Sequence, residues 1–300
     1  MMIKVTSETC IYRFSKDNKP AASVESGETV IFETLDCFGN QIQSNDDKLE
    51  TMDWNRVNPA TGPVYVNGAE PGDVLKVTIQ RITCRNKGVI ATGENFGVLG
   101  DKFKGLVSRV VPIKDDMAVF DEKLSLPLNR MIGVIGVAPE GEALNTGTPG
   151  HHGGNMDNTR ITENAVLYLP VAVPGALFAL GDLHAVMGDG EISGTGLEVA
   201  GEVQVQLEVI KGLKLNNPVL ENENFYAAIA SAATLDEAVS ASVSDMFDIA
   251  ASRIELPDTE ITMLFSLAGQ TQICQVVDPL KTARFVIPKC VLEKYNFKFV

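Results

Sequence analysis

The sequence predicts a mainly β fold that carries one helical hairpin late in the chain, at about residues 222–252. Two observations indicate the strands. Several segments alternate apolar and polar residues with a period of two, and Pro-Gly or Gly-rich turn signals lie between them. A third observation indicates the helices, because a stretch after Thr234 places apolar residues at the i, i+3 and i+4 spacing of an amphipathic helix.

The clearest strand signal covers residues 203–210, where valine and leucine alternate with glutamine and glutamate. One face of that strand should pack and the other should be solvated. Residues 74–82 show the same alternation directly after the turn signal Pro71-Gly72-Asp73. The full set of expected strands, in chain order, is 28–35, 74–82, 106–112, 131–138, 165–169, 177–180, 203–210, 261–265 and 284–287.

The strongest helix signal begins at Thr234. Glu237 lies three residues further on, which is the spacing of a capping box, and the helical period then continues to Ala250. We expect a second helix at about 225–232, directly before it. No linker or low-complexity segment divides the chain, so residues 1–300 are predicted to form a single domain.

The composition and net charge limit the kinds of partner that the chain can bind. Its 300 residues are 45% hydrophobic, which is enough for a sizeable core, and the formal net charge is −14. That charge argues against nucleic acid or an anionic membrane surface as a partner. The five cysteines are scattered, and neither a signal peptide nor a membrane-spanning segment is recognisable. We therefore expect a cytoplasmic protein with reduced thiols.

The residues that carry chemistry are concentrated between Pro139 and Glu198. All three histidines fall in this glycine-rich and acid-rich window, and histidine with carboxylate is a typical ligand set for zinc. His184 is the best single candidate, since Asp182 and Asp189 flank it; the alternative is an exposed loop histidine. His151 and His152 are adjacent, so at most one should serve a site, and we favour His152 beside Gly153 and Gly154.

Several other residues keep two interpretations. Asp36 lies at the end of a predicted strand and is either a ligand or a turn residue. Glu198, at the start of a strand, is either a ligand or a salt-bridge partner. Glu140 follows an apolar run, where burial would suit a general base. Cys37 is a conceivable nucleophile, but a buried inert thiol is the favoured interpretation.

The motifs of this region resemble the acetamidase/formamidase family. The most specific block is His152-Gly153-Gly154-Asn155-Met156-Asp157, and the others are 36–39, 137–141, 181–185, 188–198 and 275–279. The chain is similar to the shorter branch of that family. The resemblance implies hydrolysis of a short aliphatic amide to its carboxylate and ammonia. It also implies intertwined β-rich halves, sandwich-like or barrel-like, and a cytoplasmic homo-oligomer.

From the clustering of residues we predict that Asp36, His184 and Glu198 bind a divalent metal ion. Zinc is the expected ion, with calcium left open as a second one. Either Asp189 or His152 would complete the ligand set.

The remaining predicted roles concern the substrate. Glu140 is the predicted general base, His152 is an alternative oxyanion donor, and Asn155 orients the amide. The Gly153-Gly154 pair would leave room for only a small acyl group. Two alternatives stay open: hydrolysis of another small C–N substrate such as a cyclic amide or urea derivative, or a homologue that binds such a molecule or a metal without turnover.

Overall fold

A computed structural model describes residues 3–300 of the chain, with 40% of the residues in strands and 15% in helices. The strands are β1 (Ile3–Val5), β2 (Cys10–Ile11), β3 (Arg13–Phe14), β4 (Ala22–Val24), β5 (Glu28–Thr34), β6 (Ala60–Val66), β7 (Val74–Cys84), β8 (Lys87–Gly93), β9 (Leu106–Lys114), β10 (Met117–Val119), β11 (Ser125–Pro127), β12 (Met131–Gly136), β13 (Leu144–Asn145), β14 (Gly153–Asn155), β15 (Val166–Pro170), β16 (Phe178–His184), β17 (Glu198–Val199), β18 (Gly201–Ile210), β19 (Val219–Glu221), β20 (Phe225–Ala232), β21 (Gln270–Gln275) and β22 (Lys281–Pro288). The α-helices are α1 (Leu235–Ala251), α2 (Asp258–Ala268) and α3 (Lys289–Leu292). None of the helices described between residues 3 and 300 has both the length and the apolar character needed to cross a membrane.

Two large sheets pack face to face. One has nine strands in the order β1-β5-β18-β7-β15-β19-β20-β22-β21. The other has eleven, with the path β11-β10-β9-β8-β17-β16-β12-β14; in addition β6 pairs with β16, and both β2 and β4 pair with β6. The main apolar core lies between them, where Phe32 of β5 meets Phe178 of β16 edge to face at 5.6 Å between ring centroids. Neither sheet closes into a barrel, so the sandwich description applies.

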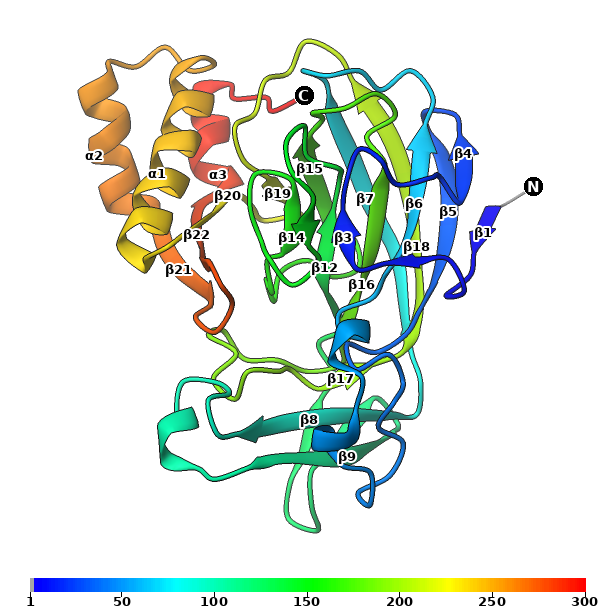
Figure 1. Cartoon of the computed structure of the whole chain (residues 1–300). Coiled ribbons are helices and arrows are strands. Elements are labelled where there is room, and N and C mark those ends of the chain that lie inside the picture. The colour runs from blue at the N-terminus through cyan, green and yellow to red at the C-terminus, as the bar shows by residue number, and fades with distance from the viewer. Residues whose placement is uncertain (1–2) are drawn as a thin grey trace.

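The chain passes repeatedly from one sheet to the other. Strands β5, β7 and β15 belong to the nine-stranded sheet, whereas β6, β8 and β16, which follow them, belong to the eleven-stranded one. Figure 1 shows β8 and β9 extending below the body of the molecule, with β17 at the junction. This junction brings the end of β16 next to loops that come from both sheets.

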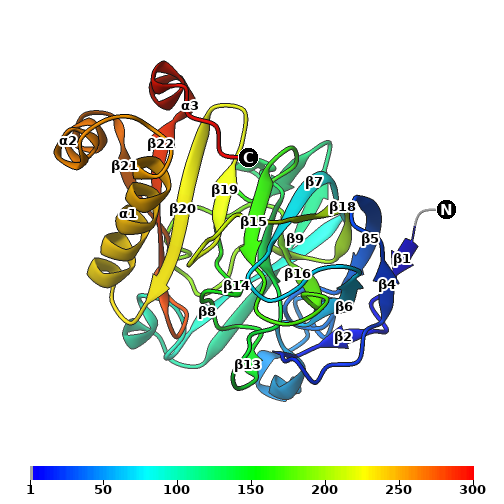
Figure 2. The same cartoon turned by 90° about the horizontal axis from the view of Figure 1, so that it is seen from above.

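The capping box predicted for the first helix is present. The Thr234 hydroxyl accepts from the Glu237 N–H at 3.3 Å, and the Glu237 carboxylate accepts from the Thr234 N–H at 3.1 Å. The buried face of α1 includes Ala238, Met246 and Ala250, and it packs on β20 and β22. Viewed from above, α1 and α2 lie along that end of the nine-stranded sheet (Figure 2).

Two predicted elements were wrong. The segment predicted as a helix at 225–232 is β20, and the segment predicted as a strand at 261–265 lies inside α2. Short apolar runs do not distinguish a buried strand from a buried helix by periodicity. The helical hairpin therefore comprises α1 and α2, so it begins later than predicted, at Leu235, and extends beyond residue 252 to Ala268.

Candidate active site

His184 is the last residue of β16, and strands pair with it on both sides. Across β12 its partner is Met131, and across β17 its partner is Glu198. Directly opposed residues of an antiparallel pair project their side chains on the same face. The register thus places the Glu198 Oε1 atom 3.1 Å from the His184 Nε2 atom.

Three further carboxylates surround the same nitrogen. From His184 Nε2, the nearest oxygen of Asp182 is 3.6 Å away, that of Asp157 is 3.7 Å away and that of Glu191 is 4.0 Å away. All five side chains are buried. We call His184, Asp157, Asp182, Glu191 and Glu198 the His184 cluster.

The backbone of this cluster is unusual. Asp157, Asp182 and Glu191 have φ values of 41°, 54° and 51°, a left-handed region that L-residues seldom adopt. Such conformations persist only where the surrounding structure holds them, and they gather at functional sites. Gly133 of β12 lies underneath, where a Cβ atom would come within 2.5 Å of Asp157 Oδ1 and 2.7 Å of Asp182 Oδ2. A side chain at position 133 would therefore push these two carboxylates apart.

Several oxygens of the cluster have no hydrogen-bond partner among residues 3–300. They are both carboxylate oxygens of Asp157, Oδ1 of Asp182 and Oε2 of Glu198. Buried polar atoms are normally paired, and a buried carboxylate without a partner is costly. Converging, unpaired oxygens beside an imidazole fit a divalent cation, for which oxygen and nitrogen are the expected ligands.

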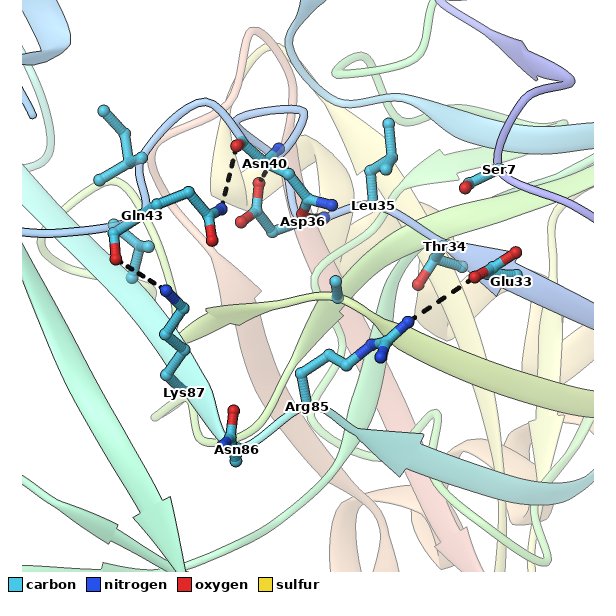
Figure 3. Close-up of a pocket in the computed structure, with 13 residues that line it drawn as sticks. Ser7, Glu33, Thr34, Leu35, Asp36, Asn40, Gln43, Arg85, Asn86 and Lys87 are labelled. Atoms are coloured by element: carbon cyan, nitrogen blue, oxygen red, sulfur yellow. Dashed lines mark hydrogen bonds and ion pairs between the residues drawn. The ribbon is translucent and has the colours of Figure 1, made fainter.

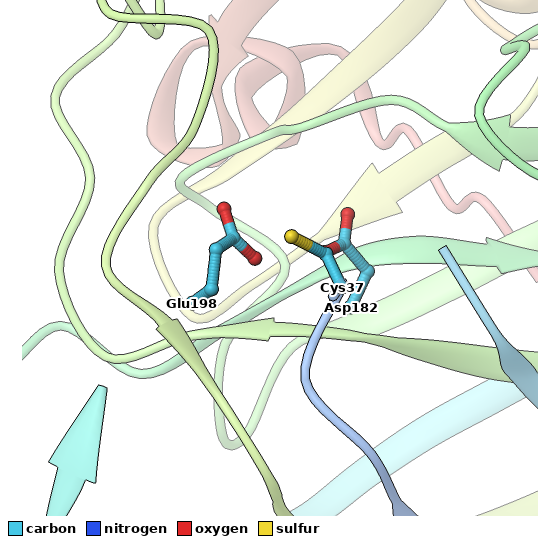
Figure 4. Close-up of side chains that lie close together, drawn as sticks. All are labelled: Cys37, Asp182 and Glu198. Atoms are coloured by element: carbon cyan, nitrogen blue, oxygen red, sulfur yellow. The ribbon is translucent and has the colours of Figure 1, made fainter. Parts of the chain in front are cut away.

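Two groups in this region have the geometry to hold an ion. Asp157, His184 and Glu191 form one, and Cys37, Asp182 and Glu198 form the other; in each, three ligand atoms lie within 4.8 Å of one another. Figure 4 shows the second group, with the Cys37 sulfur pointing into the space between Glu198 and Asp182. The residues present therefore fit a bound metal ion.

The charges of the cluster act on one another. Burial by itself would lower the pKa of His184, but Glu198 and Asp182 raise it well above its ordinary value. Burial and the neighbouring acids raise the pKa values of Asp157, Glu191 and Glu198 well above their ordinary range, although His184 opposes this. A cation within the cluster would relieve this repulsion.

Asp36 and Cys37 approach the cluster from the segment that follows β5. The Asp36 carboxylate accepts from the Asn40 N–H at 2.7 Å, as a turn residue does, and burial raises its pKa to about 6. It lines a cavity of about 290 Å³ together with Asn40, Lys87 and Val89 (Figure 3). Val89 pairs with Glu198 across β8 and β17, so this cavity lies next to the backbone that carries Glu198.

Cys37 is buried, as its favoured interpretation required. Burial and the charges of Glu198 and Asp182 raise the pKa of its thiol well above the ordinary value. A protonated thiol is a poor nucleophile. Residue type and spacing did not indicate that this thiol would lie beside Glu198.

Asn155 and Asp278 form a hydrogen-bonded pair next to the His184 cluster. The Asn155 amide donates to Asp278 Oδ2 at 3.0 Å, and its own Oδ1 is buried without a partner among the described residues. Burial raises the pKa of Asp278, with a contribution from Glu191. The free Asn155 oxygen can accept an N–H group from a small ligand.

Two residues predicted for the site lie apart from the His184 cluster. Glu140 is exposed, and the Lys16 ammonium binds its backbone carbonyl at 3.1 Å, so the burial expected of a general base is absent. Asp189 is exposed as well, and its carboxylate pairs with Arg284. Glu140 therefore lacks the burial on which its predicted role as general base depended, and Asp189, predicted to complete the ligand set, is paired with Arg284 instead.

His152 is buried at a different position along β12. It precedes β14, whose Gly153 pairs with Gly136, whereas His184 pairs with Met131 at the opposite end of the same strand. Both of its ring nitrogens lack partners among residues 3–300, and its ring contacts Phe14 at 5.1 Å. Burial, with a smaller effect of His151, lowers its pKa to about 4.

The Gly153-Gly154 pair is explained by packing. Both residues have positive φ, and a Cβ atom would meet Ile135 O at 2.3 Å or Thr148 O at 2.4 Å. The glycines are thus required by the neighbouring backbone, which is a different reason from the room for an acyl group that the sequence suggested.

Sequence reasoning gave no role to four of the acids that converge here. Asp157, Asp182, Glu191 and Asp278 all lie within the blocks that carried the family resemblance. The signal was therefore present in the motifs. The left-handed backbone that turns three of these side chains inward is not visible in residue types or spacing.

Comparison with known proteins identifies the family. The model of the acetamidase/formamidase family matches residues 3–147 and 140–244. The chain is 56% identical to a predicted acetamidase/formamidase of Thermoanaerobacter tengcongensis, with a TM-score of 0.98 over 100% of this chain and 99% of that one. It is 45% identical to an acetamidase of Bacillus halodurans, with a TM-score of 0.96 over 98% and 100% of the two chains.

The curated relatives are matched over part of their length. A formamidase of Methylophilus methylotrophus is 26% identical in an alignment of length 273 that covers 70% of this chain and 67% of that protein. The alignments with curated relatives span 63–67% of their lengths, or about two thirds. The family model nevertheless covers well over half of the chain and includes every residue of the His184 cluster. The chain belongs to the acetamidase/formamidase family.

Proposed function

We propose that the chain hydrolyses a short aliphatic amide of the formamide or acetamide type to its carboxylate and ammonia, with a divalent metal ion held in the His184 cluster. The observation that carries the proposal is the convergence of four buried carboxylates on one imidazole, with several oxygens unpaired, in a member of this family. Related proteins named formamidase and acetamidase support the substrate class.

Asp157, His184 and Glu191 form one ligand group that would hold the ion, whereas Asp182 and Glu198 belong, with Cys37, to the other. Zinc suits the imidazole and thiol donors, and calcium suits a group made of carboxylates. A bound divalent ion supplies a Lewis acid and makes water more acidic. Asp36, predicted as a ligand, is one residue from Cys37 and would support the ligand set from outside through its contact with Asn40.

The protein residues perform the remaining tasks. Amide hydrolysis needs a base to take a proton from water and an acid to return one to the departing nitrogen. A carboxylate of the His184 cluster that does not bind the ion can act first as the base and then as the acid, because the cluster carboxylates all lie close to His184 Nε2. The Asn155 Oδ1 atom can accept an N–H of the primary amide, while Asp278 holds the Asn155 side chain in place.

The first test combines metal analysis with an ammonia assay. The protein is purified without chelator, its bound metals are quantified, and ammonia release is followed with formamide, acetamide and propionamide before and after metal removal. Loss of activity on removal, and its return with one divalent ion, is the expected result. Activity that survives removal would contradict the metal dependence.

A cyclic amide and urea, added to this panel, separate the alternatives. Turnover of a cyclic amide or urea, with no release from linear amides, would favour another C–N hydrolase. Binding of an amide without ammonia release would indicate a binding protein.

A matched pair of variants tests the location. His184→Ala should lose bound metal and at least about 10²–10³-fold in kcat/KM, which is the scale for one electrostatic group at a reaction centre. His151→Ala, an exposed histidine of the same window, should retain both. An active, metal-replete His184→Ala variant would overturn the arrangement.

A further inference from the structure

Arg284 of β22 is a fully buried cation outside the His184 cluster. Its side chain has 0% exposure, and it is among the largest fully buried side chains of the described chain. A buried guanidinium requires partners for its five N–H donors. The identity of those partners indicates what Arg284 does.

The guanidinium contacts three segments that are far apart in the sequence. Its Nη1 donates to Asn158 Oδ1 at 2.7 Å, its Nη2 pairs with the Asp189 carboxylate, and its Nε donates to Gln272 Oε1 at 2.8 Å. Thr159 closes the arrangement, since its hydroxyl donates to Asp189 Oδ1 at 2.6 Å and accepts from Arg284 Nη1 at 3.3 Å. We call these five residues the Arg284 clamp.

Each of these three segments delivers an acid to the site. Asn158 directly follows Asp157, and Asp189 lies two residues before Glu191. Both Asp157 and Glu191 have left-handed backbones, which need external support. The clamp holds the neighbours of both.

The third segment is β21, which leads to Asp278. Gly190 N donates to Cys274 O at 2.8 Å, and Val276 N donates to Gly190 O at 3.2 Å, so the loop of Glu191 is bonded to β21. The Gln275 side chain then shapes the turn, because its Oε1 accepts from the Asp278 N–H at 3.0 Å.

We propose that Arg284, with Asp189 as its charged partner, is a positioning residue that fixes Asp157 and Glu191 at the distances needed to bind the metal ion and fixes Asp278 beside Asn155. This proposal rests on the proposed function, since it concerns the same ligand set. It also gives Asp189 a structural task outside the reacting centre. A planar fork with several simultaneous partners fixes geometry better than a single ammonium group.

The experiment measures metal affinity, kinetics and thermal stability on the full chain. Asp189→Asn removes the charge from a side chain that is 40% exposed, so the fold should tolerate it. Arg284→Lys keeps the charge and removes the fork. Glu221→Gln is the matched control, because Glu221 forms a partly buried ion pair with Lys289 at 2.6 Å outside the His184 cluster.

Asp189→Asn and Arg284→Lys should weaken zinc binding, measured by competition with a chelator, by about 10–100-fold, the usual cost of losing a partner that orients metal ligands. Saturating zinc should restore part of their kcat. Glu221→Gln should lower the melting temperature while metal affinity and kcat stay within twofold of wild type.

Unchanged metal affinity and kcat in Asp189→Asn would overturn the clamp, whatever happens to its melting temperature. Where Arg284→Lys does not fold, Thr159→Val takes its place and is judged by the same criteria. Failure of the proposed function is separately visible, because the wild type would then bind no metal or His184→Ala would remain active.

Discussion

The His184 cluster and the Arg284 clamp are two buried polar clusters in neighbouring loops, and they differ in how far their groups are paired. Every partner that Arg284 contacts accepts a hydrogen bond from it, and Asn158 Nδ2 is the one buried polar atom of the clamp without a partner among the described residues. The His184 cluster leaves four carboxylate oxygens without partners among residues 3–300. Polar groups that pair with one another fix structure, whereas several converging unpaired oxygens indicate a site for a cation.

Among variants that leave both clusters' own residues unchanged, the largest expected effect comes from displacing the His184 ring. A Cβ atom at Gly196 would lie 2.5 Å from His184 Nδ1, so Gly196→Ala should displace the imidazole. A shift of about 1 Å in a reacting group costs on the order of 10²-fold, and we expect that loss in kcat/KM with weaker metal binding.

Gly188→Ala is the control, since its Cβ atom would meet nothing within 4 Å. Steady-state kinetics and metal analysis on both variants decide the result. Near-wild-type activity in both variants would show that catalysis does not depend on the position of the His184 ring. The unpaired oxygens of the His184 cluster would then not indicate a catalytic site.

The ring nitrogens of His152 are also buried without partners among the described residues. This histidine therefore tests whether an unpaired buried group always marks a ligand-binding site. Burial lowers its pKa to about 4 from an ordinary 6.5, so the folded state binds fewer protons than the unfolded state between these values. Its contribution to stability is therefore complete above about pH 6.5 and is lost as the pH falls toward 4. From pH 7.5 to pH 5 the loss should be about 2 kcal/mol.

The measurement is urea unfolding of chelator-treated protein at pH 7.5, 6 and 5. His152→Gln should remove this part of the pH dependence, whereas His151→Gln, at an exposed site, should keep it. If the free energy of unfolding of His152→Gln changes with pH as much as that of the wild type, then His152 does not titrate as a buried neutral imidazole.

The smallest expected effect concerns an exposed hydrogen-bonded pair, the Thr234–Glu237 cap of α1. Thr234→Ala removes the cap of α1 and leaves the Glu237 N–H without its acceptor. We expect a loss of about 1 kcal/mol in the free energy of unfolding and no change in kcat or metal content.

Ser240→Ala, at an exposed position of the same helix, should be nearly neutral. Chemical denaturation of both variants provides the test. A change in metal content with Thr234→Ala would mean that the helical layer is coupled to the site, which the contacts described do not suggest.

Local pattern by itself determined much of the fold. The alternating segments at 74–82 and 203–210 form β7 and β18, which pair along most of their length, and the capping box at Thr234 begins α1. These signals are local, because the period of a strand and the hydrogen bonds of a cap depend on residues close in sequence. The apolar runs at 225–232 and 261–265 had no such distinguishing period, and packing decided their structure.

The sequence also identified the region of the site and its histidine, through glycine, acid and family motifs around His184. It did not determine which acids meet there. Strand register placed Glu198 opposite His184, left-handed backbones turned Asp157 and Glu191 inward, and long-range contacts brought Cys37 and Asp278 alongside. Glu140 and Asp189 carry the same carboxylate chemistry but face solvent. Residue type fixes what a side chain can do, whereas burial and convergence arise only when segments distant in sequence pack together.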